Sequence, residues 1–143
     1  MIATHVSVLD RTVHLTNAWL DELTAQGPFE ARQDAYNGFR AVLHALRDRI
    51  TPQEAVHLAS QLPMLVRGLY YEGWRPALAP DADRREEDFL GRVALRLRGG
   101  GRVEDARRVT GSVFHFLEEK ISKGEIDDVK SQLPPSIRRL FDA

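Results

Sequence analysis

The sequence predicts an all-α protein, a helical bundle of about eight helices built from two tandem, pseudo-symmetric four-helix units. Three observations predict this architecture. Apolar residues recur at spacings of three and four along most of the chain, which is the spacing of one face of an α-helix. No segment shows the apolar–polar alternation of a β-strand between two turn signals. The third observation is an internal repeat.

The repeat is visible when the chain is aligned with itself at an offset of 71 residues. The predicted units cover about 12–72 and 86–143, joined by a loop over 73–85 within a single domain, 1–143. Because a unit of about 70 residues would be marginally stable alone, we expect the two units to share one core. The thirteen identical pairs are Asp34/Asp105, Ala35/Ala106, Val42/Val113, His44/His115, Leu46/Leu117, Ile50/Ile121, Glu54/Glu125, Ser60/Ser131, Gln61/Gln132, Leu62/Leu133, Pro63/Pro134, Arg67/Arg138 and Leu69/Leu140.

The first two helices of each unit follow from apolar stripes. In the first unit they are predicted over Thr12–Gln26 and Glu30–Arg49. Gly27-Pro28 separates them, since glycine and proline together interrupt a helix.

The third and fourth helices follow from capping and proline signals. Thr51-Pro52-Gln53-Glu54 and Ser122-Lys123-Gly124-Glu125 both predict capping boxes, in which the hydroxyl and the glutamate bond reciprocally to backbone N–H groups. A Leu-Pro step then ends the third helix in each unit. Short final helices are predicted over Met64–Tyr71 and Ser136–Phe141.

Composition excludes several classes of function. The chain has 143 residues and a net charge of −1, which argues against a specific nucleic-acid partner and against attachment to an anionic membrane. No stretch reaches the roughly 20 apolar residues of a membrane span. The absence of cysteine excludes disulfides, thiol nucleophiles and cysteine-ligated zinc. We therefore expect a cytoplasmic protein without a cofactor, since the first residues also lack a signal-peptide pattern.

The histidine pair His44 and His115 is the first candidate site, because the two residues occupy equivalent repeat positions. One interpretation is a solvent-facing or inter-unit histidine that was inherited when the unit duplicated. The other is a symmetric metal or proton-transfer pair, although no spacing such as H-x-x-x-H supplies a second ligand nearby. Glu54 and Glu125 are assigned to the capping boxes, and His57 is left without a ligand partner.

Arg67 and Arg138 are the second candidate pair, again at equivalent positions in the final helices. Together with His44 and His115, they are candidate partner-contact residues. The competing interpretation is an intramolecular ion pair or a cation at a helix C-terminus.

Four segments resemble a known family. They are the Leu62-Pro63 step, the segment Gly68-Leu69-Tyr70-Tyr71-Glu72-Gly73-Trp74, Asp88-Phe89-Leu90 with Val93, and the segment from Gly124 to Pro134. The chain resembles the bacterial family catalogued as Domain of Unknown Function 2267, from about Leu15 to Phe141. The resemblance implies a small, mostly helical bacterial protein. It brings no activity, substrate or catalytic residue.

Two functional hypotheses follow. The leading one is a non-enzymatic interaction or structural module that offers a helical groove to an unidentified protein partner or to a second copy of itself. The alternative is a small-ligand- or metal-responsive regulatory domain that uses the pocket between the two units. No signature of nucleophilic or metal-dependent catalysis is present in the sequence, so the expected protein is not an enzyme.

Overall fold

The computed structural model describes residues 6–97 and 101–142, and the regular structure within them is entirely helical. The prediction of an all-α bundle of about eight helices is confirmed. Among these residues, no helix combines the length and the apolar character that crossing a membrane requires. The elements are α1 (Ser7–Gln26), α2 (Arg32–Arg47), α3 (Pro52–Ala59), α4 (Met64–Tyr71), η1 (Pro76–Leu78), α5 (Glu86–Leu95), α6 (Val103–Lys120), α7 (Lys123–Gln132), α8 (Pro135–Arg138) and η2 (Arg139–Asp142).

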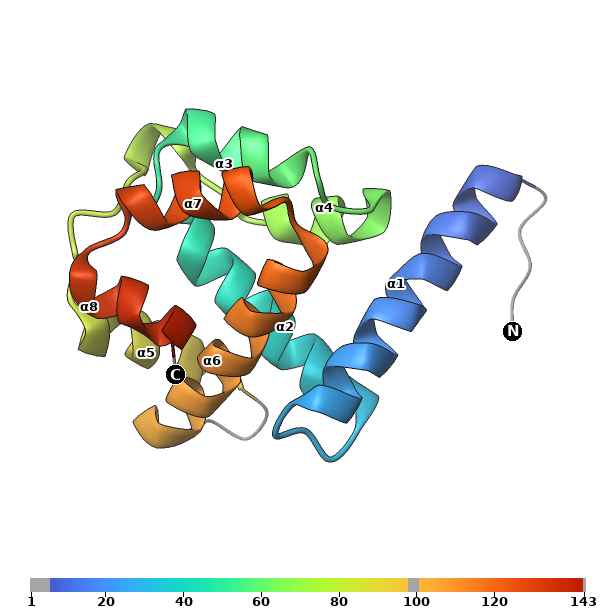
Figure 1. Cartoon of the computed structure of the whole chain (residues 1–143), viewed down its shortest axis with the longest axis horizontal. Helices are drawn as coiled ribbons and strands as arrows, with labels where there is room; N and C mark the ends of the chain where they lie inside the picture. The colour runs from blue at the N-terminus through green and yellow to red at the C-terminus, as the bar shows by residue number, and fades with distance from the viewer. Residues whose placement is uncertain (1–5, 98–100, 143) are drawn as a thin grey trace.

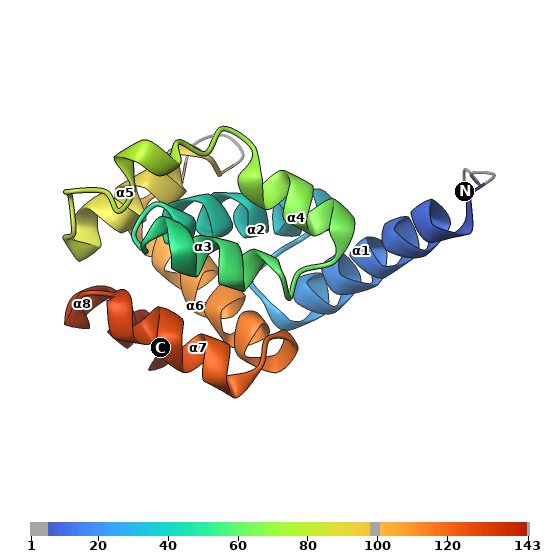
Figure 2. The same cartoon turned by 90° about the horizontal axis from the view of Figure 1, so that it is seen from above.

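Helices α2 and α6 cross at the centre of the bundle, and the other elements pack around them (Figure 1). Helix α2 contacts α1, α4 and α5, whereas α6 contacts α1, α5, α7 and η2. Helices α3 and α7 lie side by side on one surface (Figure 1). The N-terminal half of α1 projects from the body, as Figure 2 also shows.

One continuous apolar core joins the two predicted units. At its centre, Trp19, Phe39 and Phe116 pack edge to face with ring centroids 5.6–6.5 Å apart. Gly38 of α2 lies so close to α6 that a Cβ atom there would be 2.8 Å from Cγ1 of Val109. Val109 is the residue that the repeat alignment pairs with Gly38, so equivalent positions meet where the central helices cross.

Most helix boundaries agree with the sequence prediction, with three differences. The first helix begins at Ser7 rather than at Thr12, because its apolar stripe continues outward from the body. The last helix is split into α8 and the 3₁₀ helix η2. The predicted loop over 73–85 contains the short η1. The predicted four-plus-four organisation of the two units stays a prediction.

Candidate functional site

His44 of α2 is buried, and its ring forms hydrogen bonds with two other segments of the chain. Its Nε2 is 2.7 Å from the carbonyl oxygen of Leu69, so this nitrogen carries the proton and donates. Its Nδ1 then accepts from Nη1 of Arg96 at 3.0 Å. Burial lowers the pKa of His44 to about 4, the charges of Arg47, Arg40 and Arg96 act in the same direction, and the bond to Leu69 opposes them. The ring is therefore neutral at physiological pH.

His115, at the equivalent position in α6, is exposed. Both nitrogens of His44 already have partners, and neither partner is His115. A neutral imidazole that donates from one nitrogen and accepts at the other has no lone pair left for a metal ion. The geometry therefore gives no support to a metal or proton-transfer pair at these two residues, and His44 instead links α2 to α4 and to the end of α5.

Arg67 and Arg138 make equivalent hydrogen bonds within the chain. Arg67 donates from Nε to the carbonyl of Ala59 and from Nη2 to that of Leu62, both at 3.0 Å. Arg138 makes the corresponding two bonds at the end of α7, at 3.0 and 2.9 Å. Each guanidinium thus bonds two carbonyl groups near the end of α3 or α7, one of which also accepts from a backbone N–H. This arrangement accounts for both arginines without a partner protein.

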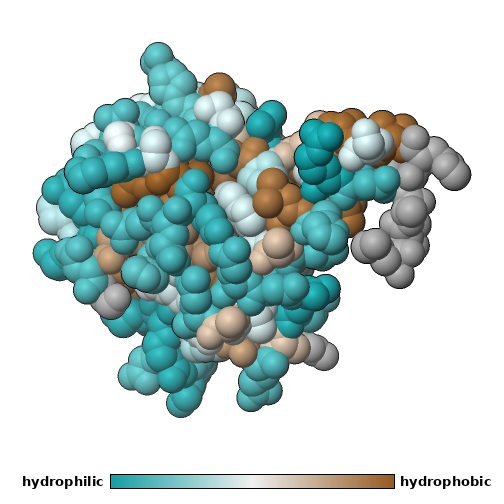
Figure 3. Space-filling model, turned by 45° about the vertical axis from the view of Figure 1, so that its right-hand side comes forward, coloured by the Kyte–Doolittle hydropathy of each residue, from teal (hydrophilic) through white to brown (hydrophobic). Residues whose placement is uncertain are grey.

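A groove of about 730 Å³ lies between α1 and α4. It belongs to the N-terminal half of the chain, and Figure 3 shows apolar side chains along the projecting part of α1 and at its junction with the body. Met64 and Leu65 of α4 are 51% and 46% exposed. The groove is lined by Leu9, Thr12, Val13, Thr16, Asn17, Leu20, Tyr36, Met64, Leu65, Gly68, Leu69 and Glu72.

One face of α1 is apolar along its length, yet only its C-terminal half is covered. Leu9, Val13, Thr16, Leu20 and Leu23 follow one another at alternating spacings of four and three. Thr16, Leu20 and Leu23 are buried against the body, whereas Leu9 and Val13 are exposed. The uncovered half of α1 therefore carries the same pattern that the covered half uses for packing.

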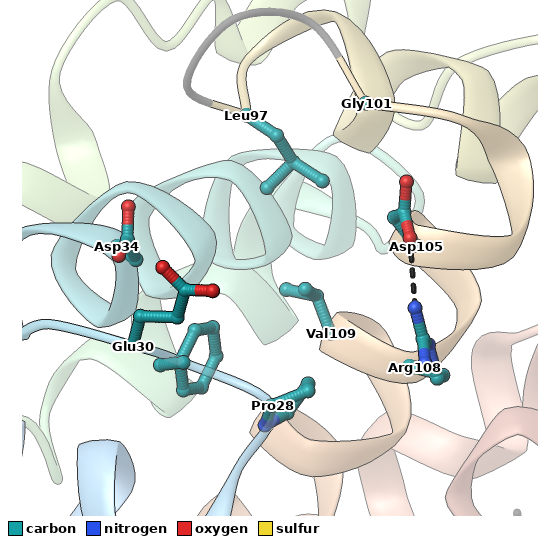
Figure 4. Close-up of a pocket in the computed structure, with 9 residues that line it drawn as sticks. Pro28, Glu30, Asp34, Leu97, Gly101, Asp105, Arg108 and Val109 are labelled. Carbon is teal, nitrogen blue, oxygen red and sulfur yellow. Dashed lines mark hydrogen bonds and ion pairs between the residues drawn. The ribbon is translucent and has the colours of Figure 1, made fainter.

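A smaller cavity of about 360 Å³ lies between the two predicted units, where the chain enters α2 and α6. Figure 4 shows Glu30, Asp34 and Asp105 around it, with Asp105 bonded to Arg108 at 2.8 Å. Asp34 accepts from the backbone N–H of its own helix N-cap residue at 3.1 Å, and Asp105 does the same at 3.2 Å. The bond to that N–H is the main reason that the pKa of Asp105 is lowered. Helix capping explains both aspartates.

In each of the predicted capping boxes at α3 and α7, only the hydrogen bond to the hydroxyl forms. The hydroxyl of Thr51 accepts from the backbone N–H of Glu54 at 3.2 Å, as the sequence predicts. The backbone N–H of Thr51, however, donates to Oε1 of Gln132 from the other helix at 2.8 Å. The N–H of Ser122 likewise donates to Oε1 of Gln61 at 2.8 Å. Gln132 at the end of α7 and Gln61 just after the end of α3 thus take the role expected of the two glutamates.

Glu54 and Glu125 instead meet between α3 and α7. Each residue is 8% exposed, and each has a buried Oε2 atom without a hydrogen-bond partner among the described residues. Burial raises the pKa of Glu125 to about 8, and contact with Glu54 adds to this effect. Near neutral pH the two carboxyl groups therefore hold one proton between them.

His57 completes a cluster with these two glutamates. Its Nδ1 is 4.0 Å from Oε2 of Glu54, and one donor atom from each of the three residues lies within 4.8 Å of the others. This cluster was not predicted from the sequence, because both glutamates match capping boxes there. A signal was present, since the Glu54–His57 spacing recurs as Glu125 and Asp128 at the equivalent repeat positions.

Comparison with known proteins identifies the family of this chain. A family model described as "Uncharacterized conserved protein (DUF2267)" matches residues 16–140, which is most of the sequence. The search of curated proteins found no match. The resemblance seen in the sequence is thereby confirmed at the level of the family: the chain belongs to the DUF2267 family.

Proposed function

We propose that this protein is a non-enzymatic interaction module that associates with a second copy of itself through α1 and α4. The observation that carries the proposal is the uncovered apolar stripe of α1 beside the exposed Met64 and Leu65 of α4. A continuous exposed apolar surface of this kind is typical of an interaction site. A cytoplasmic location in a bacterial cell is part of the same proposal.

A second copy of the chain is a suitable occupant for two reasons. In a two-fold contact, each copy presents the same surface, so the projecting α1 of one copy covers the groove of the other and is covered in return. The lengths also correspond, since the nine residues of α1 that precede the buried Thr16 span about 14 Å and the eight residues of α4 span about 12 Å. The net charge of −1 opposes such pairing only weakly.

Sedimentation velocity of the full chain, from about 1 µM to about 1 mM, tests the proposal. We expect the sedimentation coefficient to rise with concentration from a monomer to a dimer value. Leu9→Asp and Leu65→Asp, which place a charge on the two sides of the groove, are expected to abolish the rise. Both side chains are exposed in the monomer, so the variants retain the folded core.

Leu95→Asp is the matched control. Leu95 is 83% exposed at the end of α5 and does not line the groove, so its replacement is expected to leave association unchanged. A wild-type protein that stays monomeric across the whole concentration range refutes self-association. A control variant that dissociates as readily as the two groove variants refutes the assignment of the contact to α1 and α4.

The alternative proposal is a ligand- or metal-responsive regulatory domain. Its support comes from Glu54, His57 and Glu125 rather than from the histidine pair that the sequence suggested. Glu54 and His57 come from the first predicted unit and Glu125 from the second. A ligand bound by all three would therefore join the two units.

A further inference from the structure

We propose that Glu54, His57 and Glu125 form a binding site for one divalent transition-metal ion, with Zn²⁺ as the best match, at the interface of α3 and α7. This proposal does not depend on the groove between α1 and α4. Its basis is the position and chemistry of three side chains that two helices bring together.

The donor set favours Zn²⁺ over Mg²⁺. One imidazole nitrogen and two carboxylate oxygens are donors that Zn²⁺ accepts, and three protein ligands leave one coordination position for water. Mg²⁺ prefers oxygen donors in an octahedral arrangement and keeps several of its waters. The presence of His57 therefore separates this cluster from an ordinary group of acidic residues.

The distances require only a small adjustment. Zinc bonds of about 2.1 Å place two tetrahedral ligands about 3.4 Å apart. The three donor atoms here already lie within 4.8 Å of one another. Rotation of His57, whose side chain is 56% exposed, can shorten the remaining separation without disturbing the core.

The carboxyl groups of Glu54 and Glu125 also lack hydrogen-bond donors from the rest of the described chain for one oxygen each. Both are more than nine-tenths buried, and their Oε2 atoms find no hydrogen-bond partner within residues 6–97 and 101–142. Apart from each other, these two oxygens have no hydrogen-bond partner among the described residues, and a buried carboxylate charge without a cation is costly. A divalent cation would bind both oxygens and balance the charge of the two carboxylates.

Helix capping does not explain these glutamates either. Gln132 and Gln61 already satisfy the N-cap N–H groups of Thr51 and Ser122. Glu54 keeps only a long contact of 3.4 Å from Nε2 of Gln132 to its Oε1 atom. The glutamines thus leave Glu54 and Glu125 directed at each other.

Isothermal titration of the metal-free, untagged full chain with ZnCl₂, MnCl₂ and MgCl₂ tests the site. We expect one Zn²⁺ per chain and a higher melting temperature in its presence. Mg²⁺ is expected to bind at least about tenfold more weakly than Zn²⁺. His57→Ala and Glu125→Gln are each expected to weaken Zn²⁺ binding by at least about tenfold, since each removes a ligand.

His115→Ala is the matched control, because it removes another exposed histidine from a helix outside the cluster. It is expected to bind Zn²⁺ as the wild type does. Circular dichroism of the metal-free variants checks folding, and the exposed position of His57 makes its variant the decisive one. The proposal is overturned if the wild type binds no Zn²⁺ up to about 1 mM, if His57→Ala binds it equally well, or if His115→Ala loses binding to the same extent.

Discussion

Acidification to about pH 5 is expected to remove the stability that the buried, neutral His44 contributes to this protein. The neutral ring donates to the carbonyl oxygen of Leu69 and accepts from Arg96. Protonation would place a second donor against the Arg96 guanidinium in a buried position, where desolvation lowers the pKa of His44 to about 4. The unfolded chain keeps a pKa near 6.5, so it binds this proton more tightly than the folded protein does.

The sign and the size of the effect follow from proton linkage. Because the unfolded state binds more protons between the two pKa values, the free energy of unfolding rises with pH in that window and falls on acidification. Between about pH 7.5 and about pH 5, the pKa of 6.5 in the unfolded state against about 4 in the folded state corresponds to a loss of about 2 kcal/mol. Glu125, whose pKa is raised to about 8, takes up a proton in the folded state over the same interval and acts in the opposite direction. The contribution of His44 is therefore isolated by comparing the wild type with a variant in which only His44 is changed.

Urea unfolding at the two pH values measures this loss. His44→Gln cannot titrate, so we expect the wild type to exceed this variant in stability by about 2 kcal/mol more at pH 7.5 than at pH 5. His115→Gln, which removes the exposed histidine at the equivalent position, is expected to follow the wild type at both pH values. If the difference between the wild type and His44→Gln is the same at both pH values, the buried neutral histidine is refuted.

Three further predictions concern packing and hydrogen bonding. Gly38→Ala places a Cβ atom 2.8 Å from Val109 at the crossing of α2 and α6, so thermal denaturation should show a loss of about 1–3 kcal/mol; a neutral result would contradict the close approach. Gly68→Ala, in the exposed interior of α4 with no described atom within 4 Å of the added Cβ, should instead gain about 0.5–1 kcal/mol in the same assay. Gln132→Ala removes the acceptor for the Thr51 N–H and should cost about 1 kcal/mol in urea unfolding, whereas unchanged stability would show that this bond contributes nothing.

The sequence was sufficient wherever a structure depends on neighbouring residues. Thr51 and Pro52 start α3, and Ser122 starts α7, because capping involves groups within one turn of the chain. Gly27-Pro28 separates the first two helices for an equally local reason. The apolar spacings gave the all-α class, since a helix must bury one face. The outer start of α1 was missed because no capping side chain marks it.

Contacts between distant segments were decided only by the tertiary structure. On a helical wheel His44 falls on the polar side of α2, yet it is 2% exposed because α4 and the end of α5 cover that side. Glu54 and Glu125 each match a capping box, and nothing local shows that Gln132 and Gln61 take over that role. Only the packing of α3 against α7 lets these glutamines bond the N-cap N–H groups in place of the glutamates, and brings Glu54 and Glu125 together. Local chemistry therefore determined where the helices begin and end, and their packing determined which polar side chains are left to bind a ligand.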